Sequence, residues 1–216
     1  FACSECTIPC EHVGAAFSFI LEEKLALGLS APPPERLPVE SLSAEEMIRQ
    51  AIEERKERAR TEKMTLKSMN PAELWTDYTI TSHSSGKSYR VALRGWERGD
   101  SYCSCPDFKK NTLGTCKHIM HVIEEVKKRF SKTVRETPYE IEGIGVHLRY
   151  GEDTELRVLV PENLDRRLMM IIRPVMNKPI KDVKELLRQI KEVGRLGHEV
   201  TIYPDAEEYI NRALYL

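Results

Sequence analysis

The feature that most constrains this chain is the arrangement of its six cysteines, which fall into two short clusters at residues 3–10 and 103–116. Each cluster contains three cysteines and closes on a Cys-x-His sequence. Three thiols and one imidazole are the ligand set of a closed, tetrahedral structural zinc site. The candidate ligands are Cys3, Cys6, Cys10 and His12 in the first cluster and Cys103, Cys105, Cys116 and His118 in the second.

Three disulfide bonds are the alternative use of six cysteines, and a catalytic thiol is a further one. Disulfides form in oxidising compartments, and Phe1–Cys10 lacks the basic start and apolar run of a signal peptide. Each cluster holds an odd number of cysteines, so local pairing would leave one thiol over. No run approaches 18 apolar residues. We therefore expect a cytoplasmic zinc protein with no membrane segment.

The spacing within the second cluster indicates which elements hold the metal. Cys103 and Cys105 are two residues apart, so on an extended segment both side chains point to one face. Cys116 and His118 stand at the start of a pattern in which apolar residues recur at helical spacing. A strand is therefore predicted to supply two ligands and a helix start the other two, with residues 106–115 as the connecting loop.

Two strand-like runs, residues 76–82 and 88–94, precede this cluster and predict a β-hairpin with Gly86 in its turn. The turn sequence Gly-Lys-Ser is similar to the end of a phosphate-binding loop. Thr81 stands where that motif requires another glycine, and the residues that follow form a strand rather than a helix. Nucleotide binding is therefore excluded at this turn.

A hairpin followed by Cys103-Ser-Cys105-Pro, a variable loop and Cys116-Lys-His118-Ile resembles the SWIM-type zinc finger over about residues 75–130. The resemblance implies a small ββα-type module that binds zinc and contacts DNA or protein. SWIM modules occur in Swi/Snf-family ATPases, Mutator-type transposases and some ubiquitin ligases. The wider layout is most similar to the N-terminal region of bacterial Swi/Snf-family helicases, which implies a helicase-like ATPase core elsewhere in the full-length protein.

The first cluster differs from this pattern, because its opening pair is Cys3-x-x-Cys6 rather than Cys-x-Cys. Its closing Cys10-Glu-His12 matches, and an apolar helical pattern follows. We interpret residues 1–29 as the truncated tail of a second zinc-binding module with its helix. Its fourth ligand is either Cys3 or a residue upstream of this sequence.

The region between the clusters is divided by proline and charge. Residues 30–43 contain four prolines and predict a stiff, extended linker. Ser43 and Glu46 form a capping box at the start of a charged helix. This helix is assigned to residues 44–67. Its acidic and basic side chains are interspersed, which favours a solvated helix over one that binds phosphates. The finger itself is assigned to residues 68–135.

Charge points to a possible partner of the finger. The chain has 33 basic and 34 acidic residues, which excludes a uniformly basic, histone-like protein. Residues 109–135, however, hold eight Lys and Arg against two Glu, which is typical of a phosphate-binding surface. Trp96, Tyr102 and Phe108 could stack on bases, although a core role is favoured, and His121 is favoured as a helix-surface residue over a substitute ligand. The candidate nucleic-acid-binding residues are Arg94, Arg98, Lys109, Lys110 and Lys117.

Residues 136–216 predict a small α+β unit, so the whole chain is expected to be α+β with helices flanking the finger. His147 and His198 stand apart from other ligand-type residues, and no catalytic set can be assembled. The chain is therefore expected not to be an enzyme by itself, and the alternative to DNA binding is a protein-interaction module. The expected elements are strands at 139–150, 155–160 and 199–203, and helices at 164–175, 181–193 and 205–214, the last with Asp205 as N-cap.

Overall fold

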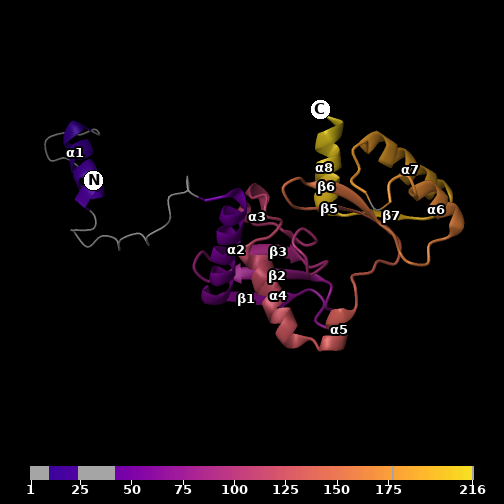
Figure 1. The fold of residues 1–216 in the computed structure, drawn as a ribbon, viewed down its shortest axis with the longest axis horizontal. Coiled ribbons are helices and arrows are strands. Elements are labelled where there is room, and N and C mark those ends of the chain that lie inside the picture. Colours follow the sequence, from indigo (N-terminus) through magenta and orange to yellow (C-terminus); the bar gives the residue numbers. More distant parts are fainter. Residues whose placement is uncertain (1–9, 24–41, 177, 216) are drawn as a thin grey trace. The chain divides into compact units, whose positions relative to one another are not determined.

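The computed structural model describes residues 10–23, 42–176 and 178–215 (Figure 1). The chain divides into two compact units, Phe1–Met47 and Ile48–Leu216. Helices and strands are mixed along the sequence, which confirms the α+β class. Among the helices of the described residues, none combines the length and the apolar character that crossing a membrane requires.

The first unit contains helix α1 (Glu11–Glu23) and the start of α2 (Ala44–Thr61). Residues 24–41, which include most of the expected linker, lie outside the described residues. The predicted capping box at the start of α2 is confirmed. The Glu46 backbone N–H donates to Ser43 Oγ at 3.3 Å, and the Ser43 N–H donates to the Glu46 carboxylate at 2.9 Å.

The second unit begins with a four-stranded antiparallel sheet in the order β1-β2-β3-β4. The predicted hairpin is confirmed, with Thr81 opposite Ser88 and Gly86 at a φ of 65° in the turn. The charged helix assigned to residues 44–67 ends at Thr61 instead, and residues 64–68 form the edge strand β1, which extends the sheet beyond the hairpin. The strands are β1 (Met64–Ser68), β2 (Asp77–Ser82), β3 (Ser88–Ala92) and β4 (Tyr102–Cys103).

Three helices follow this sheet: α3 (Pro106–Lys110), α4 (Lys117–Arg129) and α5 (Lys132–Glu136). Helix α4 confirms the helical pattern after the second cluster and buries its apolar face in the same core as β2 and β3. Helix α3 was predicted as loop. It forms because proline is favoured in the first turn of a helix, where its missing N–H costs no hydrogen bond.

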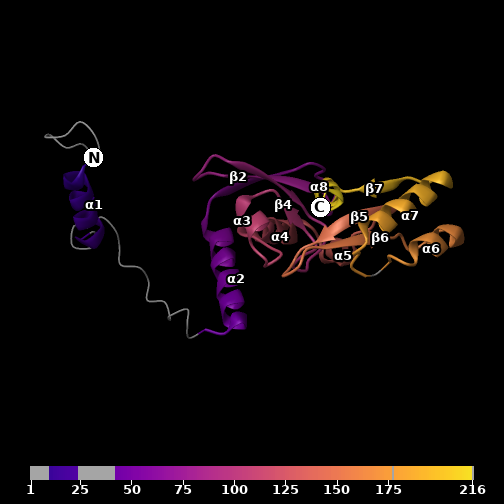
Figure 2. The same ribbon diagram turned by 90° about the horizontal axis from the view of Figure 1, so that it is seen from above.

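The C-terminal part contains all six expected elements. Strands β5 and β6 form an antiparallel hairpin, and β7 pairs in parallel with β5 after the chain has crossed through α6 and α7. Helices α6, α7 and α8 lie beside these strands in both views (Figures 1 and 2). The elements are β5 (Ile144–Arg149), β6 (Glu155–Leu159), α6 (Arg166–Ile172), α7 (Val183–Arg195), β7 (Val200–Ile202) and α8 (Pro204–Leu214).

The prediction that Asp205 is the N-cap of the last helix was wrong. Tyr203 occupies that position, and Asp205 lies in the first turn. Its carboxylate instead forms an ion pair with the guanidinium of Arg94 at 3.1 Å, with side chains only 4% and 5% exposed. Tyr150, which packs against both hydrophobic cores of the second unit, donates its hydroxyl to the same carboxylate at 2.5 Å. The finger and the C-terminal part are therefore joined by a buried charged contact.

Candidate metal centre

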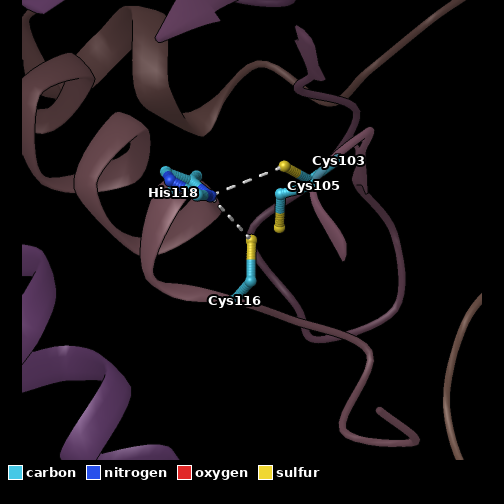
Figure 3. A group of neighbouring side chains, drawn as sticks. All are labelled: Cys103, Cys105, Cys116 and His118. Atoms are coloured by element: carbon cyan, nitrogen blue, oxygen red, sulfur yellow. Dashed lines mark hydrogen bonds between the residues drawn. The ribbon is translucent and has the colours of Figure 1, made fainter. Parts of the chain in front are cut away.

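The four residues of the second cluster converge from three consecutive elements (Figure 3). Cys103 ends strand β4, and Cys105 is the N-cap of α3. Cys116 is the N-cap of α4, and His118 lies in the first turn of that helix. The predicted helix start provides Cys116 and His118, but the strand provides only Cys103, because Cys105 lies beyond β4 as the N-cap of α3.

The geometry of this cluster fits a tetrahedral zinc ion. One ligand atom from each residue lies within 4.8 Å of all the others. His118 Nδ1 is 3.9 Å from Cys103 Sγ and 4.0 Å from Cys116 Sγ. A tetrahedron with ordinary zinc–sulfur and zinc–nitrogen bonds has sulfur–nitrogen edges of about 3.6 Å. Cys103, Cys105, Cys116 and His118 are therefore positioned to bind zinc.

Burial explains why these thiols favour a cation. Cys103, Cys105 and Cys116 are at most 1% exposed. Hydrogen bonding among the three thiols raises the pKa of Cys103 and lowers that of Cys105, and burial raises the pKa of Cys116 to about 12. Three thiolates packed together without water need a positive charge between them, and a divalent metal supplies it.

Two further contacts orient the ligands. The backbone N–H of Phe108 donates to Cys105 Sγ at 3.3 Å, so this sulfur both faces the cluster and caps α3. His118 turns Nδ1 toward the thiols, while its Nε2 is buried with no hydrogen-bond partner among the described residues. The Tyr89 ring lies against the imidazole, with ring centroids 4.8 Å apart. Nδ1 is therefore the imidazole nitrogen that is positioned to bind the metal.

Most side chains of helix α2 are exposed, as expected of a solvated charged helix, but one face of the helix packs against the finger. Arg55 forms a bidentate ion pair with Asp107 of α3, at 2.6 and 3.0 Å. Ala59 of α2 is fully buried, and its carbonyl oxygen contacts His121 Nδ1 at 2.8 Å. His121 thus holds α2 rather than the metal. The contact of Arg55 with the finger could not be predicted from the sequence, because the residues around Arg55 in α2 are charged as well.

The structure separates the five candidate nucleic-acid-binding residues into two groups. Arg98, Lys109 and Lys110 are exposed. Arg94 is not available to a phosphate, because its guanidinium is buried against Asp205. Lys117 is also a correction, because its ammonium group pairs with Glu62, which directly follows α2, and its side chain is only 14% exposed.

The aromatic residues near the metal centre confirm the core interpretation. Phe108 is 4% exposed, and Trp96 and Tyr102 pack against the same hydrophobic cluster. The indole N–H of Trp96 donates to the Arg135 carbonyl at 3.0 Å, which fixes its ring. These rings complete the small core of the finger.

Only part of the first cluster is described. Cys10 Sγ lies 3.7 Å from His12 Nδ1 at the start of α1, the separation expected of two side chains two residues apart that face one centre. Cys3 and Cys6 lie outside the described residues. The predicted second zinc module therefore stays a prediction.

Comparison with known proteins addresses the finger alone. Residues 95–127 match the family model of the SWIM zinc finger. No curated protein and no solved structure matches the chain. The matched segment includes all four residues that converge on the metal centre. The chain therefore contains a SWIM zinc finger in which Cys103, Cys105, Cys116 and His118 are positioned to bind zinc.

Proposed function

We propose that this chain is a zinc-organised DNA-binding module of a cytoplasmic Swi/Snf-type helicase or a related regulator. In this role the chain binds and does not catalyse, and the ATPase core belongs to another part of the full-length protein. The resemblance of residues 75–130 to SWIM modules and the match of residues 95–127 to that family support the zinc-dependent part of the proposal.

One observation carries the DNA-binding part. Cys105 is a metal ligand and also the N-cap of α3, and α3 ends on the exposed pair Lys109 and Lys110. Zinc binding therefore fixes the short helix that presents these two ammonium groups. Arg98 provides a third exposed cation in the matched segment. Cations held in place on a folded surface release counterions when they contact phosphates, which favours DNA binding.

The proposal is tested by fluorescence anisotropy with the zinc-loaded chain and labelled 20-base-pair duplex or 20-nucleotide single-stranded DNA. Binding at 50 mM NaCl that weakens steeply by 200 mM NaCl is the expected result, because each phosphate contact contributes to the salt dependence. K109Q/K110Q is expected to weaken binding several-fold. The matched control K63Q/K67Q removes two exposed lysines from the α2–β1 region and should leave the affinity unchanged.

A protein-interaction module without nucleic-acid binding is the second candidate. It is favoured by the charge of the matched segment, since residues 95–127 contain five basic and five acidic side chains. Failure to bind either DNA at 50 mM NaCl would remove the DNA-binding proposal and leave this one.

A further inference from the structure

The outer face of α7 carries a row of basic side chains. Lys184, Arg188, Lys191 and Arg195 are spaced four, three and four residues apart, so they lie on one face of the helix. Lys181, three residues before Lys184, extends the row. All five side chains are exposed. The opposite face of α7 is anchored in the protein by its buried residues, which are Val183, Leu186, Gln189 and Val193.

Helix α6 and its connection to α7 add further cations. Arg166, Arg167, Arg173 and Lys178 are exposed. Because α6 and α7 pack against each other, we refer to these cations and the row on α7 together as the α6–α7 basic surface. Between residues 161 and 198, nine basic and five acidic side chains give a net charge of +4, in a chain whose overall charge is −1.

Most of these cations are available to a ligand. On α7, Arg188 pairs with Glu185 and Arg195 pairs with Glu192 at the surface. Within the part of the chain that the structure describes, no ion pair involves Lys181, Lys184 or Lys191, or the four cations of α6 and the connection. Exposed ion pairs contribute only about 0–1 kcal/mol, so a polyanion can also compete for the two arginines.

The other charged regions of the chain offer fewer cations that are free of ion pairs. Helix α2 contains five basic and five acidic side chains, and several of its cations are engaged within the protein, among them Arg55 with Asp107 and Arg60 with Glu124. Residues 109–135 hold eight basic and two acidic side chains, but several of these cations are engaged within the protein. Lys117, Lys128 and Lys132 form ion pairs, and the Arg129 guanidinium donates to the Pro71 carbonyl oxygen. Among the described residues, the larger group of exposed cations without an ion pair therefore lies at α6–α7, away from the residues predicted from the sequence.

The chemistry of this surface fits a phosphate backbone. The helical part of the row, from Lys184 to Arg195, extends about 17 Å, with a charge about every 5 Å, which covers roughly five phosphates of one DNA strand. Residues 161–198 contain no Phe, Tyr or Trp, so base stacking is not available there. A membrane is a poorer partner, because the apolar face of α7 is buried in the protein and cannot enter a bilayer.

We propose that the α6–α7 basic surface binds the phosphate backbone of duplex DNA without sequence preference, and that it provides most of the affinity of this chain for DNA. The inference rests on the proposed DNA-binding function but assigns the main contact to the C-terminal part rather than to the finger. The finger then contributes a second contact through Lys109 and Lys110.

The test compares two triple variants of the zinc-loaded full chain by anisotropy with a labelled 20-base-pair duplex from 50 to 200 mM NaCl. K181Q/K184Q/K191Q removes three lysines that have no ion pair, and the control K63Q/K67Q/K87Q removes three exposed lysines elsewhere. The α7 variant is expected to bind about ten-fold or more weakly, with a salt slope smaller by roughly 3. The control should match the unmodified chain, and both variants should keep its melting temperature.

The outcomes separate the two proposals. Equal affinity of the α7 variant and the control, with the unmodified chain still binding duplex, overturns the α6–α7 assignment and leaves the DNA-binding function standing. If the unmodified chain binds no duplex at 50 mM NaCl, the proposed function itself fails. Co-sedimentation with phosphatidylserine vesicles in place of duplex binding, lost in the α7 variant, would contradict this inference by identifying the surface as membrane-binding.

Discussion

The SWIM finger and the C-terminal part of the second unit are stabilised in different ways. The buried core of the finger includes three cysteines, and its metal ligands come from short elements such as the two-residue strand β4. The core of the C-terminal part is aliphatic and contains no cysteine among its buried members. Metal binding can therefore stabilise a region whose helices and strands are too short to bury a large apolar area.

The two regions are nevertheless not independent. Tyr150 packs against both cores, and the buried pair of Arg94 and Asp205 connects β3's end to the start of α8. Loss of the metal should therefore unfold the finger first, while a break in the buried pair should destabilise both regions together. The following predictions test this distinction.

The largest effect is expected from loss of a metal ligand. Cys116→Ala, or zinc removal by a chelator, eliminates an apparent binding free energy on the order of 10–16 kcal/mol. Hydrogen exchange followed by mass spectrometry should show β3, β4 and α4 unprotected, whereas β5, β6 and α7 keep their protection. Unchanged protection of α4 in the variant would argue against a structural role for the metal.

A smaller but more widespread effect is expected from Asp205→Ala. The substitution leaves the Arg94 guanidinium buried without its partner, which typically costs about 3–5 kcal/mol. Urea unfolding should show one transition at lower denaturant, with both regions affected. The double variant R94M/D205A also replaces the buried guanidinium with an apolar side chain, so it should recover part of the lost free energy of unfolding. A Gln substitution at the exposed Arg98 provides a control that should have almost no effect.

A glycine at the boundary allows a third comparison. Gly99 has a φ of 99°, and a Cβ there would lie 2.2 Å from the Tyr150 carbonyl oxygen. Gly86 also has a positive φ, of 65°, but has open space around it. Gly86→Ala should cost about 1 kcal/mol from backbone strain alone. Gly99→Ala should cost clearly more in the same unfolding measurement, and equal losses would contradict the close packing.

The smallest effect is expected at the contact between α2 and the finger. Glu62→Gln removes the carboxylate that pairs with the partly buried Lys117 and should cost about 1 kcal/mol. Its control, Glu53→Gln, removes an exposed pair with Lys56 and should cost a few tenths of a kcal/mol at most. A melting-temperature shift no larger for Glu62→Gln than for Glu53→Gln would mean that α2 is not held by this pair.

The sequence predicted those parts in which local chemistry determines structure. The four ligands, the hairpin and the helix after Cys116 follow from residue types and spacing, and all three are confirmed. Strand β1 was missed because Met64–Ser68 is short and its pairing with β2 is decided by tertiary contact. Helix α3 was missed because its five residues carry no periodic pattern, and its start depends on the cap by Cys105.

The roles of individual charges were much harder to predict. Arg94 and Lys109 are both basic residues near the finger, yet one is buried against Asp205, 111 positions away, and the other is exposed. Sequence alone gives the sign of a charge but not its distant partner. The row on α7 could have been found from its helical spacing, since that pattern is local.

The most direct test of the structural zinc site is the zinc content of the purified chain, measured by elemental analysis beside the variant C103S/C116S. The unmodified chain should contain at least about one zinc per molecule, and the variant should contain about one fewer. A second zinc in the unmodified chain that persists in the variant would belong to the first cluster. No zinc in the unmodified chain, or the same content in both proteins, would contradict a metal centre formed by Cys103, Cys105, Cys116 and His118.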